Sequence, residues 1–252
     1  MVGGMQADMR TSVENEWLCA RILKAYGLPV AHSEIAHFGS QKVLVVERFD
    51  RQLHSSKKYW LRFVQEDFCQ ATATPSSMKY ESDHGPGTLD IARILRGSIN
   101  RDLDLACLLK AQILFWMLAA TDGHAKNFSI RILNQGRYQL TPLYDVLSIW
   151  PVIGEGANAI SWHNAKLAMS VRGKNKHYLL KDIQRRHFNI TAAQCGAGES
   201  AESLIAEILA STPAVIASVQ ENLPTDFPQQ VLDGILQGLA NSAERLATMP
   251  PA

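Results

Sequence analysis

The pattern of hydrophobic and polar positions predicts a short β-containing region at the start of the chain. Thr11 to Glu14 resembles a capping box and predicts a first helix, which Gly27 and Pro29 end. Apolar runs at Glu34–Phe38 and Lys42–Arg48 predict two strands joined by a turn at Gly39 and Ser40. The second run is too apolar for a strand with one solvated face, so we expect it in the centre of a sheet. A polar loop at Arg51–Lys58 and a strand at Tyr59–Val64 follow.

The remainder of the chain is dominated by helical patterns. Leu103–Ala120 is apolar nearly all round, but Asp104, Lys110 and Gln112 argue against a membrane span and favour a buried central helix. Thr74–Gly87 is rich in Ser, Pro and Gly and predicts a loop. The predicted helices are Glu66–Ala71, Thr88–Arg96, the long helix capped at Asp102 and ending at Ala120, His177–Arg186, Thr191–Cys195, Glu199–Ala210, Pro213–Asn222, and Phe227–Leu246 capped by Thr225 or Asp226.

A predicted hairpin connects the residues with the clearest chemistry. Phe128–Leu133 and Arg137–Thr141 alternate as strands do, and they flank the turn residues 134–136. This hairpin puts Asn127 at its entrance and Asp145 just past its exit, so we expect the two side chains to lie close together.

Composition and charge bear on whether the protein binds nucleic acid, membrane or zinc. The chain has 252 residues and a formal net charge of +1, which gives no overall indication of nucleic-acid or membrane binding. The four cysteines are scattered without a C-x-x-C pair, which argues against zinc and fits reduced thiols in the cytoplasm. The first ten residues lack a long apolar stretch, so we expect no signal peptide. A basic run between Arg172 and His187 is either a solvated face or a contact for an acidic partner, tRNA or operator DNA.

The stretch from Asp122 to Asp145 has the residue types and spacing of a phosphoryl-transfer site. Asp122 precedes Asn127 by five positions, as in the D-x-x-x-x-N catalytic loop of protein kinases. There the Asp accepts the proton of the attacking hydroxyl, and the Asn and a later Asp, here Asp145, hold Mg²⁺. His124 and Lys126 lie inside the loop and could face phosphate oxygens. The alternative is an ordinary surface loop, because Asp-Gly and Asn are common turn residues.

Several longer motifs are similar to the HipA family of bacterial toxin kinases. They are S-V-E-N-E-W, V-E-R-F-D-R, Q-E-D-F-C-Q, P-S-S-M-K-Y-E-S-D, T-D-G-H-A-K-N-F-S, L-T-P-L-Y-D-V-L-S and L-P-T-D-F-P. The resemblance implies a kinase-like fold that uses ATP and Mg²⁺. It places Glu47 and Phe49 at the hinge that meets adenine, Tyr144 against the nucleotide, and the Q-E-D-F-C-Q and K-Y-E-S-D stretches beside the cleft. It also implies a helix-turn-helix antitoxin of HipB type as partner, glutamyl-tRNA synthetase as a substrate, and DNA contact through the antitoxin alone.

The phosphate-binding elements of such a kinase are not found in the sequence. Neither G-x-G-x-x-G nor G-x-x-x-x-G-K-[ST] occurs. The resemblance implies that the nucleotide lysine, the phosphate loop and a regulatory serine belong ahead of Met1, and therefore that the chain is truncated. A catalytically inactive binding module is accordingly an alternative to an active kinase. A small-molecule kinase of the aminoglycoside or choline type fits less well, because those show H-G-D where Thr121 precedes Asp122 here.

These patterns together predict an α+β fold, mainly helical, of the kind found in the large lobe of protein kinases. Residues 1–50 would be a remnant of the small lobe and the hinge, and residues 51–252 the large lobe. The predicted function is an ATP- and Mg²⁺-dependent protein serine/threonine kinase of the HipA toxin type, located in the cytoplasm.

Overall fold

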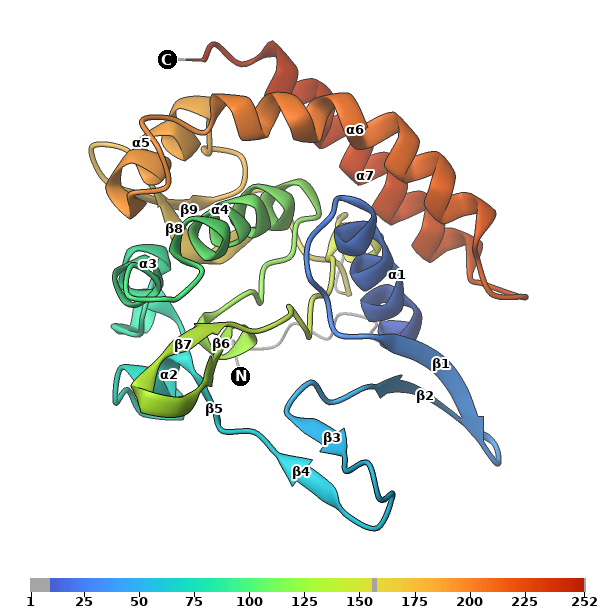
Figure 1. Ribbon diagram of the computed structural model, residues 1–252. Helices are drawn as coiled ribbons and strands as arrows, with labels where there is room; N and C mark the ends of the chain where they lie inside the picture. Colours follow the sequence, from blue (N-terminus) through green and yellow to red (C-terminus); the bar gives the residue numbers. More distant parts are fainter. Residues whose placement is uncertain (1–9, 156–157, 252) are drawn as a thin grey trace.

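The computed structural model describes residues 10–155 and 158–251 (Figure 1). Residues 1–9, on which most of the expectation of no signal peptide rests, lie outside the described part. The helices are α1 Ser12–Ala25, α2 Phe68–Ala71, α3 Thr88–Leu95, α4 Arg101–Met117, α5 Arg185–Cys195, α6 Glu202–Glu221 and α7 Gln229–Thr248. The strands are β1 Ser33–Phe38, β2 Gln41–Val46, β3 Arg51–Leu53, β4 Trp60–Arg62, β5 Gln65–Asp67, β6 Ser129–Ile132, β7 Tyr138–Leu140, β8 Lys166–Arg172 and β9 Lys176–Leu179.

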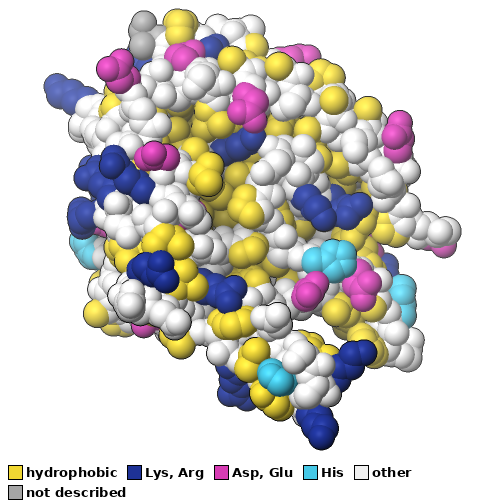
Figure 2. Space-filling model, viewed as in Figure 1, with side chains coloured by type: hydrophobic (Ala, Val, Ile, Leu, Met, Phe, Trp, Pro, Cys, Tyr) yellow, Lys and Arg dark blue, Asp and Glu magenta, His cyan; other side chains and the backbone are white. Residues whose placement is uncertain are grey.

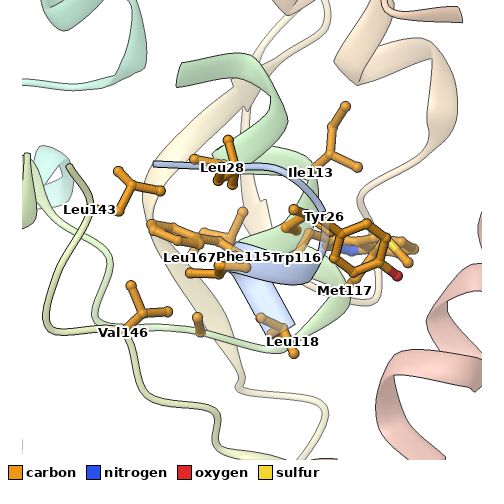
Figure 3. Close-up of a cluster of buried hydrophobic side chains, with 14 of the residues drawn as sticks. Tyr26, Leu28, Ile113, Phe115, Trp116, Met117, Leu118, Leu143, Val146 and Leu167 are labelled. Atoms are coloured by element: carbon orange, nitrogen blue, oxygen red, sulfur yellow. The ribbon is translucent and has the colours of Figure 1, made fainter. Parts of the chain in front are cut away.

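Helix α4 lies at the centre of the molecule, as its all-round apolar pattern predicts. It contacts α3, α5, α7, β7 and β8, and Phe115, Trp116 and Met117 are almost completely buried (Figure 3). Its polar residues have partners: Asp104 accepts a hydrogen bond from the Leu140 amide at 2.9 Å, and Lys110 pairs with Glu207 of α6. The expected cap at Asp102 is wrong, because Asn100 is the N-cap and Asp102 lies inside the first turn.

Helix α1 belongs to the same hydrophobic core as α4, α6 and α7. The ring of Trp17 lies 5.8 Å from that of Phe227, and the hydroxyl of Tyr26 is 2.7 Å from that of Thr212 on α6. The expected capping box is wrong, because Thr11 makes no side-chain cap hydrogen bond and Glu14 instead pairs with Lys42 of β2. The predicted division between residues 1–50 and 51–252 stays a prediction. The packing described here places α1 in the same core as the helices of the second part.

The strands form small antiparallel sheets around the helices in the described part of the chain. β1 and β2 form the expected hairpin, but β2 pairs with β1 alone there, so its predicted central position is wrong. β3 lies in the segment predicted as a polar loop, Arg51–Lys58, and pairs with β4, which lies in the predicted strand Tyr59–Val64. β5 joins the predicted β6–β7 hairpin in a three-stranded sheet, and α2 follows β5 directly.

The segment from residue 166 to the end differs most from the expectation. β8 and β9 form a hairpin where a helix was predicted over His177–Arg186, because β9 is stabilised by pairing with β8 and not by a local pattern. α6 runs through Pro213 as a single helix, and its packing on α1 and α7 outweighs the helix-breaking tendency of proline. α7 begins after Pro228 without the expected cap from Thr225 or Asp226.

Two features of the surface are the apolar helix α6 and the exposed β3–β4 hairpin. Among the described helices, α6 alone is long and apolar enough to span a membrane. This is weak evidence for a membrane span, because α6 packs on α1 and α7. The β3–β4 hairpin protrudes from the molecule, and Figure 2 shows hydrophobic side chains beside Lys and Arg on this lower part. The exposed large hydrophobic residues of this region are Leu53, Tyr59, Trp60, Leu61 and Val64.

Candidate active site

The loop that carries Asp122 and Asn127 follows α4 directly and is folded closely against it. Ala119 adopts a positive φ of 48° and turns the chain away from the helix axis. A side chain at Gly123 would overlap the ring of Phe115, so the loop needs glycine there to approach α4. A short 3₁₀ turn at Ala125–Asn127 then leads into β6. The buried core helix therefore sets the position of the loop.

Asn127 and Asp145 are in direct contact, as the predicted hairpin requires. Nδ2 of Asn127 donates hydrogen bonds to Oδ2 of Asp145 at 2.7 Å and to its backbone carbonyl at 3.1 Å. Oδ1 of Asn127 accepts from the amide of His124 at 2.9 Å, and the side chain is almost completely buried. These three bonds hold the beginning of the loop, the hairpin entrance and the hairpin exit together.

Asp145 occupies a strained backbone position. Its φ is +58°, in the left-handed region that residues with a Cβ atom rarely adopt. The segment that follows is fixed to α1, because Asn15 donates to the carbonyl of Ser148 at 2.7 Å and accepts from its amide at 2.8 Å. A strained backbone, an exposed carboxylate that contacts buried Asn127, and a following segment fixed to α1 are together typical of a functional site.

Asp122 lies on the other side of the loop and faces a separate groove. Its side chain is 60% exposed, its Oδ1 accepts a hydrogen bond from the Tyr80 hydroxyl at 2.5 Å, and its Oδ2 lies 3.8 Å from Nε2 of His124. The groove has a volume of about 650 Å³, and its walls come from the segments 77–83, 121–122 and 160–168. Asp122 is therefore accessible to a large molecule.

The structure buries His124 and leaves the side chain of Lys126 35% exposed. His124 is buried with its ring edge-on to Tyr80, and burial lowers the pKa of its imidazole while the charge of Asp122 opposes that shift. Nζ of Lys126 lies 2.7 Å from Oδ2 of Asp67, and this hydrogen bond raises the pKa of the lysine. Both residues thus already have structural contacts, and their predicted role toward phosphates stays a prediction.

A second cleft lies between the β2–β3 connection and Asp145. It has a volume of about 350 Å³, and the predicted residues Glu47, Phe49, Tyr144 and Asp145 all line it. The rings of Phe49 and Tyr144 are 5.8 Å apart, and the Tyr144 hydroxyl donates to the Lys126 carbonyl at 2.8 Å. The amide of Glu47 already donates to the His32 carbonyl at 2.8 Å. The cleft has the aromatic walls and nearby carboxylate that a nucleotide site needs.

Residues that sequence reasoning missed also line the two cavities. Glu16 of α1 lines the second cleft, where burial and the charge of Asp145 raise its pKa to about 7. Gln65 lines the same cleft, and its buried Oε1 has no hydrogen-bond partner. Tyr80 contacts Asp122. All three residues lie in motifs that resemble the HipA family, and these motifs were the only sequence signal that could have identified them: Glu16 in S-V-E-N-E-W, Gln65 in Q-E-D-F-C-Q and Tyr80 in P-S-S-M-K-Y-E-S-D.

The donor set fits a magnesium ion in its chemistry. Asp145 offers an exposed carboxylate, and Oδ1 of Asn127 accepts one hydrogen bond and so retains a lone pair. In the described residues there is no group of three or more His, Cys, Asp or Glu that could hold a metal by itself. This agrees with the preference of Mg²⁺ for one or two carboxylates together with water and substrate phosphates.

Comparisons with known proteins show the family of the chain. Residues 3–216 match the model of the HipA-like C-terminal domain. The chain is 33% identical over 215 residues to the putative kinase Y4mE of Sinorhizobium fredii, covering 84% of this chain and 48% of that protein. It is 37% identical over 149 residues to the serine/threonine-protein kinase toxin HipA of Shewanella oneidensis, covering 54% of this chain and 34% of that protein. The chain thus spans less than half the length of these relatives.

Two solved structures share the fold. One is a chain of the Shewanella oneidensis complex of HipA, HipB and operator DNA, with a TM-score of 0.77, 23% identity, and coverage of 93% of this chain and 56% of that one. The other is the Helicobacter pylori proinflammatory kinase CtkA, with a TM-score of 0.61, 13% identity, and coverage of 95% and 82%. The predicted α+β kinase-like fold is confirmed.

Proposed function

This chain belongs to the HipA-like C-terminal domain family, and on that premise we propose that it forms the catalytic lobe of an ATP- and Mg²⁺-dependent protein serine/threonine kinase of the HipA toxin type. The observation that carries the proposal is the direct contact between Asn127 and Asp145, with Asp122 exposed on the same loop. Kinase-named relatives at 33% and 37% identity support the reaction class.

In this proposal Asp122 accepts the proton of the acceptor hydroxyl. The exposed carboxylate in the groove of about 650 Å³ supports the role, because a segment of a protein substrate can reach it there. An ionised carboxylate within hydrogen-bond distance of the hydroxyl both orients the nucleophile and removes its proton.

Asn127 and Asp145 would hold Mg²⁺, and the cleft of about 350 Å³ would hold ATP with Glu47, Phe49 and Tyr144 around the base. Bound there, the ion would neutralise charge on the phosphate oxygens. Asp145 keeps its carboxylate in place through Asn127 and through the backbone fixed to α1. His124 and Lys126 would act on this site indirectly, through the loop conformation that their contacts maintain.

The partners are proposed by analogy with the relatives. The fold is shared with a chain of a HipA, HipB and operator DNA complex, which supports a HipB-type helix-turn-helix antitoxin for this protein, with DNA contacted through that antitoxin. Glutamyl-tRNA synthetase is the proposed protein substrate, and the cytoplasm is the proposed location.

A second proposal concerns the chain by itself. Its cleft is bounded on one side by the two-stranded β1–β2 hairpin, where Val46 is 39% exposed. The cleft is open on this side. We therefore propose that the chain by itself, with no other protein segment covering the cleft, is a module that binds nucleotide or antitoxin without turnover.

A phosphoryl-transfer assay on the complete protein tests the proposed kinase. Labelled ATP is supplied with glutamyl-tRNA synthetase or a general protein substrate, and wild type is compared with Asp122→Asn. We expect the variant to fold and to lose at least about 100-fold in rate, as expected for loss of a general base. Asp102→Asn is the matched control, because Asp102 is 94% exposed on α4, and it should keep the wild-type rate. Wild-type transfer by Asp122→Asn would place the active site elsewhere.

A further inference from the structure

Tyr80 contacts the proposed catalytic base from a distant part of the chain. It lies between the 3₁₀ turns Ser76–Met78 and Glu81–Asp83, and its hydroxyl donates a hydrogen bond of 2.5 Å to Oδ1 of Asp122. The other oxygen, Oδ2, lies 3.8 Å from His124, beyond hydrogen-bond distance. The two oxygens of the carboxylate are therefore in different environments.

The segment around Tyr80 is firmly held. The Tyr80 carbonyl accepts from the amides of Asp83 at 3.0 Å and Gly85 at 2.9 Å. The next residue, Glu81, is buried, accepts from the amide of Ser170 at 2.6 Å, and pairs with Lys176 at 2.9 Å. These contacts fix the backbone at the tyrosine and directly after it.

The ring of Tyr80 is half-buried and has two contacts. Nζ of Lys79 lies 5.0 Å from the ring centroid, and the His124 ring lies 5.3 Å away in an edge-on orientation. A side chain at Gly85 would overlap the backbone carbonyls of Met78 and Tyr80. Glycine at this position therefore lets the chain pass close to those carbonyls. The two ring contacts and the hydrogen bond to Asp122 favour one orientation of the Tyr80 side chain.

We propose that Tyr80 is a positioning residue for Asp122, whose hydroxyl fixes Oδ1 and leaves Oδ2 as the oxygen that receives the proton of the acceptor hydroxyl. This inference rests on the proposed kinase function. Both residues line the groove of about 650 Å³, so the acceptor meets a carboxylate whose orientation is already set.

The chemistry of the phenol suits this role. Burial, followed by the hydrogen bond to Asp122 and its charge, raises the pKa of the Tyr80 hydroxyl above its ordinary value. The group therefore remains a hydrogen-bond donor over the physiological pH range. Its hydrogen bond to Oδ1 therefore holds the Asp122 carboxylate in one orientation at neutral pH.

Tyr80→Phe tests the proposal, because it removes the hydroxyl and keeps the ring. Tyr59→Phe is the matched control, since Tyr59 is 52% exposed and stacks on His54 in the β3–β4 hairpin. Asp residues of the 252-residue chain are labelled with ¹³C at the carboxyl carbon, and Asp122→Asn assigns the signal. In Tyr80→Phe we expect the Asp122 carboxyl signal to change its chemical shift at neutral pH, because the hydrogen bond to Oδ1 is lost, and no change in Tyr59→Phe.

Kinetics of the complete protein give the second measurement. We expect Tyr80→Phe to lower kcat about tenfold with an unchanged KM for ATP. An unchanged Asp122 carboxyl signal in Tyr80→Phe overturns the proposal whether or not the protein is a kinase. A rise in kcat, or a lower KM for the acceptor, also overturns it, because Tyr80 would then be blocking the base. If the wild-type protein transfers no phosphate, the kinase function fails, and the Asp122 carboxyl signal still decides whether Tyr80 holds Asp122.

Discussion

Replacing Asn127 by alanine should destabilise the protein even in the absence of nucleotide and metal. The substitution removes the acceptor for the buried His124 amide and both donors to Asp145. An ordinary hydrogen bond contributes about 1 kcal/mol, a bond to a charged group about 1.5–3 kcal/mol, and an unsatisfied buried amide costs about 1–3 kcal/mol. Because the Asp145 side chain is exposed, we take the lower part of these ranges and expect a loss of about 2–4 kcal/mol.

Urea unfolding followed by circular dichroism measures this loss, and thermal unfolding should show a midpoint about 5–15 °C lower for a chain of this size. The matched control is Asn222→Ala, because Asn222 is exposed at the end of α6, where it bonds the Ser218 carbonyl. That variant should lose less than about 0.5 kcal/mol. If Asn127→Ala were as stable as Asn222→Ala, Asn127 would not be the residue that holds the loop and Asp145 together.

Two further predictions concern pH and the isolated chain. Burial and the neighbouring His177 and Arg186 lower the pKa of His187 from 6.5 to about 4, so the unfolded chain binds more protons between these values and stability should fall as pH drops from 6.5 to 4. His187→Asn keeps an acceptor for the Gln184 amide and should flatten this part of a urea-midpoint curve against pH; an equally steep curve would assign the dependence to other groups. The purified chain should bind ATP weakly, show no measurable turnover, and associate through exposed residues of its hairpins, with Phe38 66% and Trp60 62% exposed. A monodisperse monomer with steady phosphate transfer that Asp122→Asn abolishes would contradict this expectation.

The sequence predicted the parts of the fold that depend on local pattern. The apolar run of α4 and the β6–β7 hairpin are both present, and the hairpin brings Asn127 and Asp145 into contact. For these elements the interacting residues are neighbours in the sequence, so periodicity and turn chemistry were sufficient.

Other parts depend on contacts between distant residues and could not be predicted in this way. The three expected helix caps were wrong, because capping depends on the backbone conformation that tertiary packing gives to the flanking residue. The β9 segment was assigned to a helix because its pairing with β8 leaves no local signal. The contact of Tyr80 with Asp122 spans 42 positions, and no spacing rule connects the two.

Paramagnetic broadening by Mn²⁺ tests most directly the claim that Asn127 and Asp145 form the metal site of a phosphoryl-transfer centre. Mn²⁺ and ATP are added to the ¹⁵N-labelled chain, and the loss of NMR signal is followed residue by residue. We expect the side-chain amide of Asn127 and the backbone amide of Asp145 to broaden first, followed by Phe49 and Tyr144 in the adjoining cleft. Asp145→Asn should remove the effect while preserving the backbone, because asparagine tolerates the positive φ of 58° at this position. Broadening centred elsewhere on the protein, with the Asn127 signal unchanged, would contradict the account.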